Sequence, residues 1–124
     1  MSLVHIGFTI SNITTTKDMY SKVLSPLGYT LVMEGPGYAA FGKNGAPELW
    51  LGEPSENHPT VAKDIHVAFQ AESKEAVDQF HALGLAAGFK DNGKPGIREN
   101  YAPNYYAAFL FDNDGNNIEA VCFV

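Results

Sequence analysis

Two histidines occupy matching places in two segments of the chain that share one pattern. His5 lies in the run VHIGFTI, and His66 lies in IHVAFQ, where apolar residues alternate in the same phase. Such alternation predicts strands with one apolar face, and it places both histidines on the opposite face. In the run NIEAVC near the C-terminus, the same parity places Glu119 on the face away from the apolar residues.

A fourth candidate, Glu48, shares its parity with Trp50 in the run ELWL, whose leucines form the apolar face. The neighbouring Pro47 leaves open a slip of one residue that would turn Glu48 outward. Imidazole nitrogens and carboxylate oxygens bind divalent metals such as zinc, nickel, cobalt, manganese and iron. Any one of these side chains could instead meet water in an open groove. Their joint placement favours a metal site.

The segment GIRENYAPNYYAAF contains a second group of candidate residues. Arg98, Tyr101, Tyr105 and Tyr106 combine a guanidinium group with hydroxyls and flat apolar faces, a mixture suited to orienting a small anionic or aromatic ligand. The same residues could form a surface loop held by tyrosine packing and one salt bridge. Trp50 could line the same cavity or fill the core.

The elements that would position these residues occur twice in the same order. Each alternating segment is followed by a polar N-cap and a run with helical apolar spacing, which ends at Gly28 in the first half and Gly88 in the second. Each half then contains the letters YAAF, at residues 38–41 and 106–109, followed by a glycine-containing turn and a short apolar strand. The segment 90–104 is expected to be a loop, and the first half has no counterpart of that length.

The repeated order predicts one domain, residues 1–124, made of two duplicated units at about 1–58 and 62–124. The expected fold class is α+β, with two tandem βαβββ units whose strands form a curved mixed sheet around a central cavity and whose helices lie outside. A domain of this length can bury a full hydrophobic core.

Composition excludes several classes of function. The net charge is −6 and Arg98 is the only arginine, so the chain has no basic stripe for nucleic acid. No apolar run approaches the length of a membrane span, and the N-terminus lacks the pattern of a secretion signal. We expect a soluble, cytoplasmic protein without a membrane partner. The single cysteine, Cys122, excludes an intrachain disulfide and is expected to be buried.

The chain resembles the vicinal oxygen chelate superfamily, which includes glyoxalase I, fosfomycin-resistance proteins, extradiol dioxygenases, methylmalonyl-CoA epimerase and bleomycin-resistance proteins. The resemblance covers essentially the whole chain. It rests on His5 in the first strand, the segment KDMYSKVLSPLGY, His66 in HVAF, and the ending DNDGNNIEAV with Glu119. The ending is the most specific part, although Asn113 stands where family members often have proline.

The resemblance implies that His5, His66 and Glu119 are metal ligands, with Glu48 as a less secure fourth. It also implies a small substrate with two neighbouring oxygens, an enediolate-type intermediate stabilised by the metal, and Glu119 or Glu48 as the catalytic base. A homodimer is expected. The lack of basic residues resembling those with which glyoxalase I binds glutathione argues against glutathione as a cosubstrate.

Three functions remain open from the sequence. The first is a metal-dependent lyase or isomerase of glyoxalase type. The second is a metal-free protein of bleomycin-resistance type that binds a small molecule or an antibiotic. The third is an extradiol dioxygenase, which ranks last because its typical members contain twice as many of these units.

Overall fold

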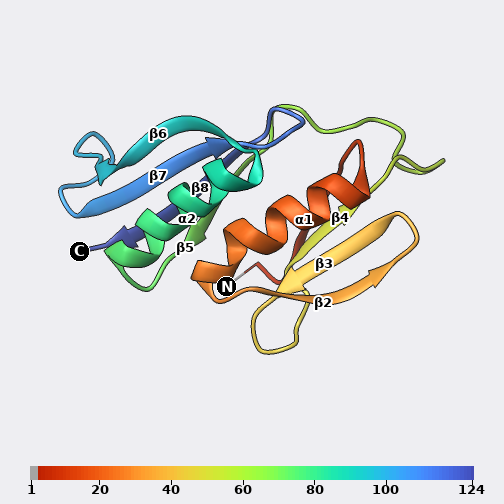
Figure 1. Cartoon of the computed structure of the whole chain (residues 1–124), viewed down its shortest axis with the longest axis horizontal. Helices are drawn as coiled ribbons and strands as arrows, with labels where there is room; N and C mark the ends of the chain where they lie inside the picture. Colours follow the sequence, from red (N-terminus) through yellow and green to blue (C-terminus); the bar gives the residue numbers. More distant parts are fainter. Residues whose placement is uncertain (1–2) are drawn as a thin grey trace.

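The computed structural model describes residues 3–124, which form two α-helices, one 3-10 helix and eight strands (Figure 1). The first half contains β1 (Ile6–Thr9), α1 (Ile13–Leu24), η1 (Ser25–Leu27), β2 (Thr30–Gly35), β3 (Tyr38–Gly42) and β4 (Leu49–Gly52). The second half contains β5 (His66–Gln70), α2 (Lys74–Ala87), β6 (Lys90–Ile97), β7 (Tyr105–Phe111) and β8 (Asn117–Phe123). None of the helices within residues 3–124 is long and apolar enough to cross a membrane.

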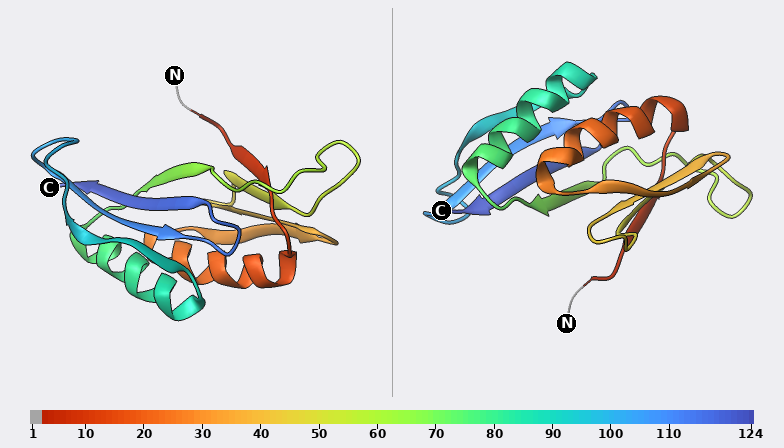
Figure 2. Two further views of the ribbon diagram at one scale, coloured as in Figure 1. Left: turned by 90° about the horizontal axis from the view of Figure 1, so that it is seen from above. Right: turned by 60° about the horizontal axis from the view of Figure 1, so that its bottom comes forward.

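The strands form two four-stranded sheets with the same internal order, β1-β4-β3-β2 and β5-β8-β7-β6. In each sheet the first and last strands of the unit pair in parallel, and the other neighbours are antiparallel. Both helices lie on one side of the strands, which leaves the other side of each sheet uncovered by helices (Figure 2). The prediction of an α+β fold built from two βαβββ units is confirmed.

Both helices begin at the polar caps that the sequence predicts. The side chain of Asn12 accepts a hydrogen bond from the Thr15 N–H, and that of Ser73 accepts one from the Ala76 N–H. The second helix ends at Gly88, whose φ of 111° lies in the left-handed region that glycine adopts without strain.

The two helices pack against each other, α2 also packs against β7, and one glycine of α2 makes this close approach possible. A Cβ atom at Gly84 would lie 2.3 Å from Leu110 and 3.1 Å from Val23. One large hydrophobic cluster therefore contains buried residues of both halves, among them Tyr20, Phe41, Phe80 and Ile118, while Ala107, Phe109 and Val121 form a second, smaller cluster.

The segment 90–104 contains a strand rather than only the expected loop. β6 pairs with β7, and its register shifts on both sides of Gly93. The sequence KDNGKPGI does not indicate a strand, because glycine and proline are depleted in regular strands. Both residues are tolerated at bulges, where the register shifts.

The two YAAF segments are not structurally equivalent. In β3, Ala39 and Phe41 face the hydrophobic core, whereas in β7 it is Tyr106 and Ala108 that pack against it. Because successive side chains of a strand point to opposite faces, the two segments differ by one residue in phase. The repeated letters are therefore a coincidence, although the order of elements does repeat.

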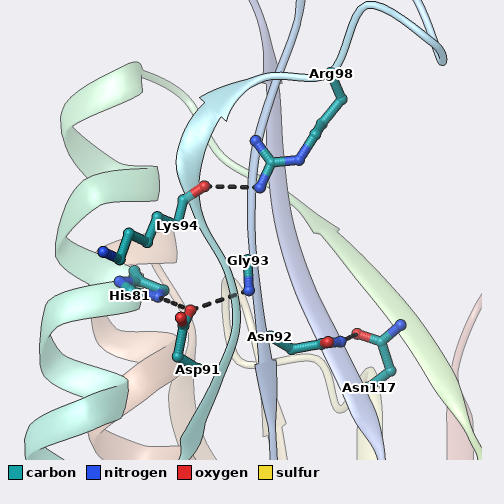
Figure 3. Close-up of polar contacts among 7 residues, drawn as sticks. All are labelled: His81, Asp91, Asn92, Gly93, Lys94, Arg98 and Asn117. Carbon is teal, nitrogen blue, oxygen red and sulfur yellow. Dashed lines mark hydrogen bonds and ion pairs between the residues drawn. The ribbon is translucent and has the colours of Figure 1, made fainter.

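A hydrogen-bonded pair joins α2 to β6. The imidazole of His81 lies 2.8 Å from Asp91 Oδ1, which also accepts a hydrogen bond from the Gly93 N–H (Figure 3). The hydrogen bond from His81 and then that from Gly93 lower the pKa of Asp91 below its ordinary value of 3.8. The stabilisation that this carboxylate contributes is thus complete above that value and is lost as the pH falls through the lower pKa of the folded state.

Replacing Asp91 by asparagine is therefore expected to lower stability at about pH 7 and to have a smaller effect at about pH 3. Urea unfolding of the wild type and Asp91→Asn at both pH values measures the change. An equal loss of stability at the two pH values would contradict the role of the charge.

Candidate functional site

The second sheet brings together two of the predicted ligands. Glu119 in β8 is opposite Ala68 in β5, and His66 lies two residues earlier on the same face. His66 Nε2 is 2.9 Å from Glu119 Oε1. The strand parity read from the sequence therefore leads to a direct contact between these two side chains.

The carboxylate of Glu119 is almost completely enclosed. Its residue is 1% exposed, and its other oxygen accepts a hydrogen bond from the Tyr105 hydroxyl. Burial, followed by the adjacent Glu119 carboxylate, raises the pKa of Tyr105 to about 12. Tyr105 therefore stays protonated at neutral pH and acts as a donor that fixes Glu119. A buried carboxylate without a cation is costly, so this group fits a site that receives a positive charge.

His5 lies beside the other sheet, the one that contains β1. It precedes β1 directly, is exposed, and lines a cavity on the face of the first sheet away from the helices. Within residues 3–124, no group of three or more His, Cys, Asp or Glu side chains is arranged to hold one metal ion. One chain thus places His5 apart from the contact between His66 and Glu119.

Glu48 does not line that cavity. β4 begins one residue later than the sequence indicates, and the Glu48 carboxylate accepts hydrogen bonds from the Tyr29 hydroxyl at 3.2 Å and the Lys43 N–H at 3.1 Å. Burial and the Glu48 carboxylate raise the pKa of Tyr29 to about 12, so this donor also remains protonated. The turn before β4 therefore directs Glu48 toward Tyr29, and Pro47 lines the cavity instead.

The register of the parallel pairs identifies a different counterpart of Glu119. In the second sheet Glu119 is opposite the residue two positions after His66, and in the first sheet Trp50 is opposite Gly7, two positions after His5. The position that carries a carboxylate in one sheet thus carries an indole in the other. At the matching positions of the two sheets, the chain therefore has two histidines, His5 and His66, but only one carboxylate, that of Glu119.

The other candidate residues have different surroundings. The Arg98 guanidinium donates to the Lys94 and Gly96 carbonyls at 2.7 and 3.0 Å and lies 5.3 Å from the centre of the Phe109 ring (Figure 3 shows the Lys94 contact). Tyr101 is exposed and packs edge-on against Tyr105.

Tyr106 belongs to the opposite face of β7. It packs against the core, and its hydroxyl donates to Asp78 of α2 at 2.6 Å. Tyr105, Tyr101 and Arg98 therefore lie at the uncovered face of the second sheet or beside it, whereas Tyr106 helps to attach α2.

A cavity of about 760 Å³ lies on the first sheet. Its lining includes Phe8, Trp50 and His5, together with His58 from the loop after β4. His58 reaches this position because the Ser55 and His58 backbones exchange two hydrogen bonds, which close the loop on itself. No sequence pattern predicts this position of His58, since it depends on the conformation of a proline-containing loop.

Comparisons with known proteins agree with this geometry. A crystal structure of a glyoxalase/bleomycin resistance protein from Albidiferax ferrireducens T118 has 27% identity and a TM-score of 0.81, over 94% of this chain and 95% of that chain. A glyoxalase/bleomycin resistance protein/dioxygenase family enzyme from Burkholderia phytofirmans PsJN has 18% identity and a TM-score of 0.75, over 100% of both chains.

Lactoylglutathione lyase from Agrobacterium tumefaciens has 19% identity and a TM-score of 0.70, over 97% of this chain and 92% of that chain. No curated protein matches the chain significantly. The sequence model of the Glyoxalase/Bleomycin resistance protein/Dioxygenase superfamily matches residues 2–120. The chain therefore belongs to this superfamily.

Proposed function

We propose that the protein is a metal-dependent lyase or isomerase that acts on a small substrate with two neighbouring oxygens. The observation that carries the proposal is the buried Glu119 carboxylate in contact with His66, with no lysine or arginine forming an ion pair with it among the described residues. His5 is the third ligand. Two imidazoles and a carboxylate suit zinc, nickel, cobalt, manganese or iron.

The third ligand comes from a second copy of the chain. His5 is exposed on one sheet, and the contact between His66 and Glu119 lies on the other. In a dimer with twofold symmetry, a contact from His5 of one copy to His66 of the other is necessarily made twice, so two complete sites form. Val4 is 77% exposed and Phe123 is 58% exposed. These two side chains supply apolar surface that such a partner would cover.

The residues have separate roles in this site. A bound cation would supply Lewis-acid polarisation of two adjacent substrate oxygens. Glu119 is the candidate base that carries a proton from one substrate carbon to its neighbour. The product then has the same atomic composition as the substrate, as an isomerisation requires. Tyr105 holds this carboxylate through its hydroxyl. Glu48 has no role in this proposal, because its oxygens contact Tyr29 and Lys43.

The hemithioacetal of phenylglyoxal, with glutathione or a smaller thiol, tests the proposed activity. Protein reloaded with each candidate metal should isomerise at least one of these adducts to the thioester, and His66→Ala should lower kcat/KM about a hundredfold or more. The Glu48→Gln variant is the control, with unchanged kcat/KM. Equal turnover by the wild type and His66→Ala would refute the proposed centre.

A second candidate is a metal-free protein that binds a small molecule. The cavity on the first sheet favours it, because that cavity is formed within one chain and is lined mainly by apolar side chains. The metal content of the purified protein distinguishes the two candidates. About one transition metal per proposed site, lost in His66→Ala, supports the enzyme.

A further inference from the structure

The cavity on the first sheet has the size and the lining of a site for a small organic molecule. Its volume of about 760 Å³ falls within the range typical of such sites. Apolar side chains from β1, the turn before β4 and β4 itself form much of the wall, namely Phe8, Ala46, Pro47 and Trp50. Polar groups are few, as expected where orientation depends on a small number of hydrogen bonds.

Trp50 forms a flat platform in this cavity. One side of its indole stacks on Tyr38, with ring centres 6.3 Å apart and planes inclined by 27°. Gly7 of β1 and Gly52, two residues further along β4, adjoin it on the same face and have no side chain to cover the indole, and Ala40 of β3, directly opposite Trp50, has only a methyl group. A Cβ atom at Gly52 would meet only the Gly37 carbonyl oxygen, at 3.9 Å. The space beside the indole is therefore open.

Two imidazoles border the same space. His5 precedes β1, and the closed loop after β4 carries His58 to the cavity wall. Among the described residues of the lining, Glu53 is the one carboxylate, and it accepts a hydrogen bond from the Ile13 N–H at 2.9 Å. A neutral imidazole has one N–H donor and one acceptor nitrogen, so two imidazoles at the wall suit a ligand with an oxygen substituent such as a hydroxyl group.

We propose that this cavity binds a planar aromatic group that stacks on Trp50 and directs an oxygen substituent toward His5 and His58. The contribution of aromatic stacking beyond apolar burial makes a ring preferable to a saturated ligand of the same size. The inference rests on the proposed function in one respect, since it names the aromatic part of a substrate whose oxygens would reach the centre at Glu119.

The test uses metal-free protein, so that it is independent of the metal centre. The chain contains one tryptophan, so its indole N–H gives one resonance in a nitrogen-15 correlation spectrum. Titration with 2-naphthol should shift this resonance, and decahydro-2-naphthol should bind about tenfold more weakly. Trp50→Leu should weaken 2-naphthol binding by a similar factor.

Gly52→Val keeps the indole but fills the space beside it, and it should abolish binding of 2-naphthol. The amide resonances of both variants show whether the fold is retained. Equal affinity for the two alcohols, or undiminished binding by folded Gly52→Val, would overturn the proposal. Aromatic binding without any metal uptake would refute the proposed enzyme and leave this inference standing. Metal uptake without aromatic binding would refute this inference and leave the proposed enzyme standing.

Discussion

Replacement of Glu119 by glutamine is expected to lower metal affinity by about a hundredfold or more while the protein remains folded. Glutamine keeps the volume of the side chain and a carbonyl oxygen that can accept from Tyr105, but it lacks the negative charge that a divalent cation requires. The wild-type carboxylate is buried beside His66, and no lysine or arginine of residues 3–124 forms an ion pair with it. Its removal should therefore leave the free energy of unfolding of the metal-free protein unchanged or raise it by about 1 kcal/mol.

Elemental analysis after chelation and reloading measures the metal, and urea unfolding of the metal-free protein measures the stability. Glu48→Gln is the matched control, because Glu48 contacts Tyr29 and Lys43 and should not alter metal binding. Full metal content in Glu119→Gln would show that this carboxylate is not a ligand. Loss of metal together with unfolding of the metal-free protein would show that Glu119 has a structural role instead.

Replacement of Asp112 by alanine is expected to cause the largest loss of stability. This residue is 4% exposed in the turn between β7 and β8, and its Oδ2 accepts from the Tyr20 hydroxyl of α1 at 2.6 Å. Oδ1 accepts from the Asp114 and Asn116 N–H groups, both at 2.9 Å. Alanine would leave these donors without their acceptor in a buried region, at a cost of about 3 kcal/mol.

Burial, followed by the charge of Asp112 and the hydrogen bond to it, raises the pKa of Tyr20 well above its ordinary value. Tyr20→Phe, which removes one donor and leaves the other contacts of Asp112, should cost about 1 kcal/mol. Asp114→Ala loses a contact with the Ser11 N–H and should cost less than about 1 kcal/mol. Urea midpoints of the three variants measure these effects, and equal midpoints for Asp112→Ala and Asp114→Ala would contradict the role of the buried carboxylate.

Alternation within strands was enough to predict that His66 and Glu119 lie on one face of the second sheet. His66 and Glu119 lie in β5 and β8, which pair without a register shift, so their parity could be read directly from the letters. The helix ends were predictable from residue type. The polar segment that contains Asn12, and Ser73 in the second half, supply side chains that cap a helix N-terminus, and Gly88 is a typical C-terminal residue.

The remaining features depend on pairing between strands and on loop conformation. Glu48 and Trp50 share a parity in the sequence, but the turn before β4 directs Glu48 toward Tyr29. Trp50 could be recognised as the counterpart of Glu119 only from the register of β1 with β4. The strand β6 was missed because its glycines and proline occupy positions where the register shifts. We retain the division into units at about 1–58 and 62–124 as a proposal.

In the proposed metal centre, His5 of one copy joins His66 and Glu119 of another. The most direct measurement is the metal content of an equimolar mixture of His5→Ala and Glu119→Gln, refolded together and reloaded. Each variant alone should bind no metal, whereas half of the randomly paired dimers would contain one intact site, which restores about one quarter of the wild-type content. A mixture that stays as empty as its components would contradict a centre shared between two copies, and metal retained by either variant alone would contradict the ligand assignment.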